Sequence, residues 1–142
     1  RSAMSSIIPV NTGLDRGIAR LIPSLAGKIS SNAVRVPTIN VSLIDMVVRT
    51  KEDVTAELVN TALQVAASSK YASLLGYTQE AHASVDFNHD PRSVIIDGTQ
   101  TQVVDGRLVK LLCWFDNEWG YANRMLDVAC YWQQLLEDSA QH

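Results

Sequence analysis

The clearest pattern of apolar positions lies in the last third of the chain, between Val109 and Leu136. Residues 110–115 are almost all apolar, which predicts a strand that is buried on both faces. Apolar residues then recur at helical spacing and predict a long helix with one apolar stripe, made of Trp119, Ala122, Met125, Leu126, Ala129, Trp132 and Leu136. The polar residues Asp116, Asn117 and Glu118 fall at the junction. Such a corner either caps a core helix or presents ligand-binding side chains, and the spacing alone favours the cap.

Earlier segments show weaker but similar patterns. Thr55 is a good N-cap for a second amphipathic helix, and Asp105-Gly106 predicts a hairpin turn. The helices we expect cover about 14–22, 55–68 and 119–136, with a further single turn at 71–75. The strands we expect cover 5–10, 29–36, 40–49, 85–87, 93–96, 99–104 and 108–115. This order predicts one α+β domain over residues 1–142, with a mixed, largely antiparallel sheet and helices packed on one face.

Composition places the chain in a broad class. With 142 residues, 46% of them apolar, and a net charge of −3, it has the profile of an ordinary soluble globular protein. It has no cluster of basic residues, so we expect no nucleic-acid partner, and no apolar run long enough for a membrane span. Cys113 and Cys130 fall in apolar segments, which indicates buried, reduced thiols in a cytoplasmic protein. The start at Arg1, within what looks like a folded segment, indicates part of a longer protein.

Three residues in the first part of the chain have the chemistry of an anion site. Thr12 and Gly13 precede the expected helix at 14–22, where a hydroxyl and helix N–H groups can bind phosphate. Arg35 lies between two valines near a strand end, so its guanidinium group needs solvent, an acidic partner or a ligand phosphate. A plain helix cap and a structural ion pair are the simpler interpretations, and the residues alone leave both open.

The three histidines carry little information. His82 and His142 look exposed, and His89 lies in a turn-forming cluster where a histidine is usually solvated. The sequence shows no spacing typical of a metal site, no glycine-rich phosphate loop and no nucleophile–base pair.

Five motifs occur in a characteristic order and spacing: Ser6-Ile7-Ile8-Pro9, Thr12-Gly13, Arg35-Val36-Pro37-Thr38, Asn40-Val41-Ser42, and Asp116-Asn117-Glu118-Trp119-Gly120-Tyr121-Ala122-Asn123-Arg124. Together they resemble the catalytic, C-terminal domain of the glyceraldehyde-3-phosphate dehydrogenase superfamily, over essentially the whole chain. Within that superfamily, two further stretches resemble the erythrose-4-phosphate dehydrogenase branch more closely. They are Val85-Asp86-Phe87-Asn88-His89-Asp90-Pro91 and Ile96-Asp97-Gly98-Thr99-Gln100-Thr101.

The resemblance implies a role for each of five residues. Thr12, with Gly13, matches the helix start that helps to bind phosphate near the reacting carbon, and Arg35 matches the arginine that holds the terminal phosphate of the substrate. Asn117 matches the residue that hydrogen-bonds the nicotinamide carboxamide of NAD, and Tyr121 matches an aromatic residue beside that ring. No residue of this chain matches a catalytic residue or a metal ligand.

The resemblance also implies a reaction. It implies an NAD-dependent, cytoplasmic enzyme that oxidises erythrose 4-phosphate to 4-phosphoerythronate for pyridoxal phosphate synthesis. Three parts of the enzyme would lie before Arg1: the nucleophilic cysteine, the histidine base and the dinucleotide-binding domain. Arg1 would then be the last residue of a loop that packs against the cofactor. The isolated chain would then be inactive, and Cys113 does not match the nucleophile. Leu14-Asp15-Arg16 stands where glycolytic members often have small residues, so this loop does not favour the binding of inorganic phosphate. That agrees with an enzyme whose acyl intermediate is released by water.

Two alternatives remain from the sequence. The first is a phosphorylating glyceraldehyde-3-phosphate dehydrogenase of glycolysis, which shares these motifs. The second is an assembly module without a catalytic role, because the catalytic domains of this superfamily build a homotetramer through their sheets.

Overall fold

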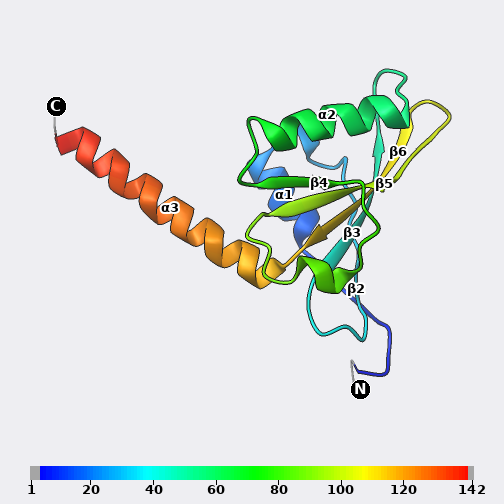
Figure 1. Cartoon of the computed structure of the whole chain (residues 1–142), viewed down its shortest axis with the longest axis horizontal. Coiled ribbons are helices and arrows are strands. Elements are labelled where there is room, and N and C mark those ends of the chain that lie inside the picture. The colour runs from blue at the N-terminus through cyan, green and yellow to red at the C-terminus, as the bar shows by residue number, and fades with distance from the viewer. Residues whose placement is uncertain (1–3, 141–142) are drawn as a thin grey trace. The chain divides into compact units, whose positions relative to one another are not determined.

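The computed structural model describes residues 4–140 and divides into two compact units (Figure 1). The N-terminal unit comprises residues 1–39 and the C-terminal unit comprises residues 40–142. Two predictions fall on residues outside those described: that Arg1 belongs to a cofactor-facing loop, and that His142 is exposed.

The N-terminal unit is a small ribbon with a helix. Strands β1 and β2 pair antiparallel, with Ile8 opposite Arg35 and Val10 opposite Ala33. The helix predicted after Gly13 is confirmed, whereas the strand predicted at 29–36 is shorter. None of residues 4–39 is buried. The elements of this unit are β1 (Ile8–Val10), α1 (Leu14–Leu21), the 3₁₀ helix η1 (Pro23–Leu25) and β2 (Ala33–Arg35).

The C-terminal unit is built on a four-stranded mixed sheet. The strand order is β3-β6-β5-β4, and every neighbouring pair is antiparallel except β4 and β5, which are parallel. The predicted α+β fold with a mixed, largely antiparallel sheet is therefore confirmed. The strands are β3 (Ser42–Arg49), β4 (Leu75–Thr78), β5 (Val94–Val104) and β6 (Leu108–Phe115).

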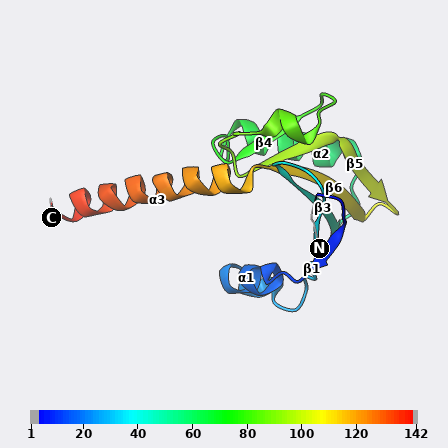
Figure 2. The same ribbon diagram turned by 90° about the horizontal axis from the view of Figure 1, so that it is seen from below.

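Helix α2 (Ala56–Ser68) packs over β4 and β5, as Figures 1 and 2 show. Thr55 caps it as predicted, because its Oγ1 accepts a hydrogen bond of 3.2 Å from the Leu58 amide nitrogen. The buried core beneath it consists of Ile96, Val109, Leu111 and Cys113. A second, smaller cluster contains Val41, Phe87 and Ile95, with Trp114 packed against it. Since β6 contributes to both clusters, the strand that leads to Asp116 is held firmly.

Three predicted elements of the C-terminal unit are wrong in detail. The strand expected at 85–87 is the 3₁₀ helix η2 (Ser84–Phe87). Its start is stabilised by the amide of the N-cap residue Ala83, which donates a 2.8 Å hydrogen bond to the Asp86 carboxylate. The strands expected at 93–96 and 99–104 form the single strand β5, with an irregularity between Asp97 and Gln102. The turn at 71–75 is followed by strand β4, which the sequence did not predict.

The predicted hairpin between β5 and β6 is confirmed. Asp105 and Gly106 both have left-handed backbone angles, with φ of 51° and 65°, in the three-residue loop between the paired residues Val104 and Leu108.

Helix α3 (Asn117–Ala140) begins two residues before its predicted start and does not pack as predicted. Of its residues only Gly120 is buried, and Figures 1 and 2 show the helix projecting beyond the sheet. Its apolar stripe is exposed, with Trp132 retaining 64% of its accessible surface. The prediction that Cys130 is buried is also wrong, because this residue lies on the exposed part of α3, whereas Cys113 is buried. Periodicity identified the apolar face correctly, but nothing among the described residues covers it.

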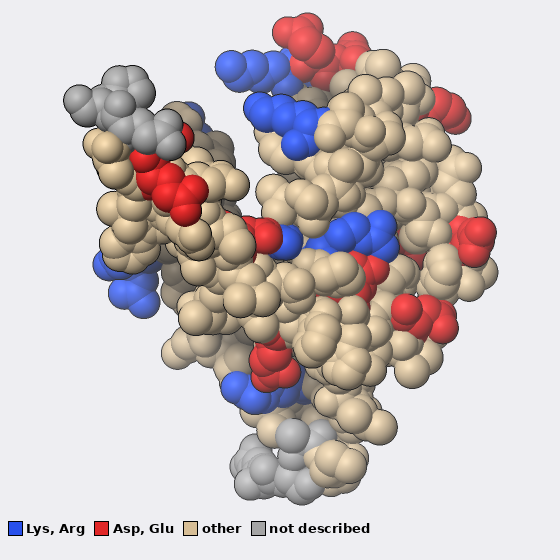
Figure 3. Space-filling view, turned by 60° about the vertical axis from the view of Figure 1, so that its left-hand side comes forward, with Lys and Arg blue, Asp and Glu red and all other residues tan. Residues whose placement is uncertain are grey.

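Burial raises the pKa of the Cys113 thiol to about 11, so this residue is a structural thiol, as its apolar surroundings predicted. No helix within residues 4–140 is both long and apolar enough to cross a membrane. On the face drawn in Figure 3, acidic and basic side chains are interspersed.

Candidate functional site

A buried and well-organised polar group lies at the junction of β6 and α3, residues 115–121, which we call the Asp116 corner. Asp116 is only 1% exposed. Its Oδ1 accepts a 3.1 Å hydrogen bond from the amide nitrogen of Trp119, and its backbone carbonyl accepts one of 2.8 Å from Gly120. Asp116 is therefore the N-cap of α3, as the acidic residue before the apolar stripe predicted.

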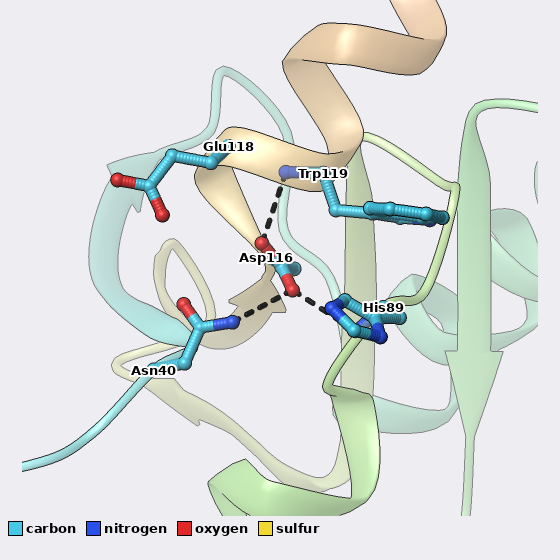
Figure 4. Close-up of a pocket in the computed structure, with 5 residues that line it drawn as sticks. All are labelled: Asn40, His89, Asp116, Glu118 and Trp119. Carbon is cyan, nitrogen blue, oxygen red and sulfur yellow. Dashed lines mark hydrogen bonds between the residues drawn. The ribbon is translucent and has the colours of Figure 1, made fainter.

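The second carboxylate oxygen of Asp116 joins two other segments to this helix start. Oδ2 accepts hydrogen bonds of 2.9 Å from the backbone amide of His89 and from Nδ2 of Asn40 (Figure 4). Burial alone would raise the pKa of the Asp116 carboxyl, but its hydrogen bonds, with the nearby His89, hold that pKa below its ordinary value. One buried, ionised carboxylate thus holds together the start of α3, the loop at His89 and the segment before β3.

A shallow cavity of about 180 Å³ lies beside this carboxylate, lined by Asn40, His89, Asp116, Glu118 and Trp119. The ring of His89 lies against that of Trp119, with 4.5 Å between the centroids, although the sequence predicted a simply solvated histidine. His89 has a left-handed backbone, with φ of 62°. Figure 4 shows that the Glu118 carboxylate points away from the two rings.

Asn117 and Tyr121, the two residues predicted to contact the cofactor, lie on one face of the first turns of α3. They are four residues apart, a spacing that places two side chains one above the other on a helix. Both are exposed, Tyr121 to 68%. Oδ1 of Asn117 accepts a 3.4 Å hydrogen bond from Oγ of Ser42. An exposed amide with an aromatic ring one turn away can bind a flat, uncharged amide.

The N-terminal unit carries the predicted phosphate-binding residues Thr12 and Gly13. Oγ1 of Thr12 accepts a 3.3 Å hydrogen bond from the amide of Leu14, the first residue of α1. Gly13 is the N-cap residue and leaves the helix start open, since a Cβ atom there would meet only Nη2 of Arg16, at 3.9 Å. The local geometry is that of a helix start whose N-cap glycine has no side chain, with the Thr12 hydroxyl and the guanidinium group of Arg16 nearby, which suits an anion.

Arg35 ends β2 and is exposed. No ion pair involves it within residues 4–140, so the structural salt bridge that the sequence left open is not found there. In the ribbon Arg35 lies opposite Ile8, whereas Thr12 follows the other end of β1. No hydrogen bond joins Arg35 to Thr12, and the guanidinium group of Arg35 is available to a ligand.

Sequence reasoning missed three residues that shape the Asp116 corner. Asn40 and Ser42 were noticed only as parts of a motif, and His89 only as part of a turn. Their contacts join residues 27 to 76 positions apart in the chain, and no local pattern reports such contacts.

His82, predicted to be exposed, is half-buried and packs on Phe87 at 5.1 Å. Within residues 4–140 no group of three or more acidic, histidine or cysteine side chains could hold a metal ion.

The chain matches a protein-family model. The model described as "Glyceraldehyde 3-phosphate dehydrogenase, C-terminal domain" matches residues 1–117. The match includes both units and ends at Asn117, so Tyr121 and the rest of α3 lie outside it.

Proposed function

The chain belongs to the glyceraldehyde 3-phosphate dehydrogenase C-terminal domain family, and from this membership we propose that it is the catalytic domain of a longer, NAD-dependent dehydrogenase of sugar phosphates. The observation that carries the proposal is the exposed amide of Asn117 at a rigid strand-to-helix corner, in a domain of a dehydrogenase family.

The residues of the Asp116 corner fit a nicotinamide group. Asn117 offers both a donor and an acceptor on a planar amide, which complements the carboxamide of the ring. Tyr121 presents an exposed aromatic side chain one turn further on. NAD bound at this corner would supply the hydride acceptor, and the residues of this chain would orient the ring that receives the hydride.

The N-terminal unit supplies groups that fit the phosphate of the substrate. Arg35 offers a planar guanidinium fork without a carboxylate partner within residues 4–140, and such a fork binds phosphate through two parallel hydrogen bonds. Thr12 and Gly13 offer an open helix start that favours negative charge. We propose that these three residues bind the sugar phosphate.

Neither thiol of this chain suits the nucleophile of such a reaction. The thiol of Cys113 is buried and its pKa is raised to about 11, so the reactive thiolate is scarce at neutral pH. Cys130 is exposed on α3, but within residues 4–140 it has no hydrogen bond to a histidine. We propose that the nucleophile and the base belong to a preceding part of the protein and that this chain alone is inactive. The two free thiols agree with a cytoplasmic location, which is part of the proposal.

For the substrate we propose erythrose 4-phosphate, oxidised to 4-phosphoerythronate with water as the acyl acceptor. The support is the resemblance of residues 85–91 and 96–101 to that branch. Both stretches adopt specific local structures: His89 has a left-handed backbone, and both the amide and the hydroxyl of Thr99 donate to the Asp97 carboxylate. The alternative is glyceraldehyde 3-phosphate with inorganic phosphate as the acceptor, and both substrates use the same groups of this chain.

An activity assay on the full-length protein tests this function. NADH formation is followed with erythrose 4-phosphate and with glyceraldehyde 3-phosphate, each with and without inorganic phosphate. We expect turnover that prefers the four-carbon sugar and does not require phosphate. Strict phosphate dependence with the three-carbon sugar would establish the alternative, and no NADH from either sugar would contradict a dehydrogenase function.

We also propose that the full-length protein is a homotetramer. Strand β3 lies at the edge of its sheet, and its apolar side chains are exposed, Val47 to 59%. The apolar stripe of α3 is exposed as well. Exposed apolar surface of this kind commonly marks a protein interface. It also keeps open a second candidate function, a self-associating module without a catalytic role. A protein that light scattering shows to be a tetramer and that forms NADH in the assay would exclude this alternative.

A further inference from the structure

We propose that Ser42 is a positioning residue that holds the side-chain amide of Asn117 in its ligand-binding orientation. The inference rests on the proposed function, because it concerns how Asn117 would meet the nicotinamide group. Ser42 itself need not touch the cofactor.

The register of the sheet places the two residues together. Ser42, the first residue of β3, pairs with Phe115, the last residue of β6, and Asn117 follows two positions later. The hydroxyl of Ser42 donates to Oδ1 of Asn117 over 3.4 Å. Because Asn117 is otherwise exposed, this contact is what restrains the rotation of its amide. With Oδ1 engaged, the Nδ2 donor group is directed away from Ser42.

The segment that carries Ser42 is itself fixed by the two residues that precede it. Val41 has a left-handed backbone, with φ of 69°, which is rare for a β-branched residue and is maintained only when the surroundings impose it. Its side chain is buried against Phe87 and Ile95. One residue earlier, Asn40 donates to the Asp116 carboxylate over 2.9 Å.

Residues 40 and 42 therefore bind residues 116 and 117 side by side, across a buried and strained Val41. A single polar contact at a flexible surface would restrain little. Here the donor is fixed by the sheet and the acceptor by the capped start of α3. Holding an amide in its bound orientation before the ligand arrives reduces the entropy lost on binding.

The test compares the binding of NAD with that of ADP-ribose, which lacks the nicotinamide ring, to the full-length protein by calorimetry. In Ser42→Ala we expect the Kd of NAD to rise roughly 3- to 10-fold, as for loss of one hydrogen bond, and the Kd of ADP-ribose to stay unchanged. Ser42→Thr keeps the hydroxyl and should restore NAD affinity. Unchanged ADP-ribose binding shows at the same time that the variant is folded.

A matched control is Ser93→Ala. It removes a hydroxyl that accepts a 3.1 Å hydrogen bond from Arg124 of α3, the helix that also carries Asn117. We expect neither ligand to bind differently. A double variant, Ser42→Ala with Asn117→Ala, should bind NAD no more weakly than Asn117→Ala alone, because Ser42 acts through Asn117.

Two results would overturn the inference alone: unaltered NAD affinity in Ser42→Ala, or equal weakening of NAD and ADP-ribose. Failure of the wild-type protein to bind NAD would overturn the proposed function, and this inference with it.

Discussion

The two groups of candidate site residues differ in how much of their geometry the chain itself fixes. At the Asp116 corner, a buried carboxylate accepts hydrogen bonds from three segments, and the adjoining strand belongs to a four-stranded sheet with two apolar clusters. The N-terminal unit, which carries Thr12, Gly13 and Arg35, has a ribbon of three residue pairs and no buried residue among those described.

The sequence shows why the two units differ. Residues 1–39 contain no Phe, Trp or Tyr, so the N-terminal unit has none of the side chains that bury the most apolar area. The C-terminal unit has all of them, and Phe87 and Trp114 stack at 5.6 Å beneath the Asp116 corner. We infer that the Asp116 corner is preorganised, whereas the residues proposed to bind phosphate depend more on what surrounds them in the full-length protein.

The largest expected effect is a difference in hydrogen exchange. Amides in β6 lie in the centre of a sheet over a buried core, so they should exchange at least about 100-fold more slowly than amides in α1, which lies in a unit without buried residues. Exchange measured by mass spectrometry on peptides from the full-length protein tests this. Equal protection of α1 and β6 would remove the proposed difference between the units.

The next largest effect is expected for Asp116→Ala. This change removes the acceptor of the His89 amide and one of the two acceptors of Asn40 Nδ2, which also donates to Oδ1 of Asn88. It should lower the free energy of unfolding by about 3 kcal/mol. Urea unfolding, with exchange of the first turn of α3 as a local reporter, measures the loss. Glu118→Ala, which removes the exposed neighbouring carboxylate, is the control and should change stability by less than about 0.5 kcal/mol. A loss as large in the control would show that Asp116 has no special role.

Arg35→Ala should separate ligand binding from stability. Because Arg35 is exposed and has no ion pair within residues 4–140, its removal should leave the free energy of unfolding nearly unchanged. The KM for the sugar phosphate should rise roughly 10- to 100-fold, as for loss of charge-assisted hydrogen bonds. Arg49→Ala is the matched control, because Arg49 also ends an exposed strand, and its KM should stay that of the wild type. An unchanged KM in Arg35→Ala would refute the phosphate role.

The smallest expected effect is the acid sensitivity of the Asp116 corner. The native pKa of Asp116 is below its ordinary value near 3.8, so its ionised form is stabilised by folding. This contribution is complete at pH values above the ordinary pKa and is lost as the pH falls from there through the lower native pKa. Unfolding of the wild type measured between pH 6 and about 3 should therefore show a steeper loss of stability than that of Asp116→Ala. Parallel curves would mean that the carboxylate contributes no pH-dependent stability.

Local signals in the sequence predicted much of the fold. Thr55 marked the start of α2, Asp105-Gly106 marked the β5–β6 hairpin, and Asp116 marked the start of α3. In each case the cap or turn itself is formed with near neighbours in the chain, so residue type and spacing were sufficient to predict it.

The errors have a different origin. An apolar stripe tells which face of α3 avoids water but not what covers it, so the packing of α3 and the burial of Cys130 were wrongly predicted. The contacts of Asn40 and Ser42 with the Asp116 corner, and the left-handed backbone of Val41, depend on the pairing of β3 with β6. Such long-range pairing is not written in any short stretch of sequence.

The central claim is that Asn117 orients the nicotinamide ring, and transfer of deuterium tests it most directly. Full-length wild-type protein and Asn117→Ala are given a sugar phosphate deuterated at the aldehyde carbon, and the face of the NADH ring that carries deuterium is determined. Asn123→Ala, which alters the half-buried asparagine that donates to the Trp119 carbonyl within α3, is the control. We predict deuterium on one face for the wild type and the control, and for Asn117→Ala deuterium on both faces, with kcat/KM for NAD lower by roughly 10- to 100-fold. Single-face transfer with unchanged kcat/KM in Asn117→Ala would contradict the account.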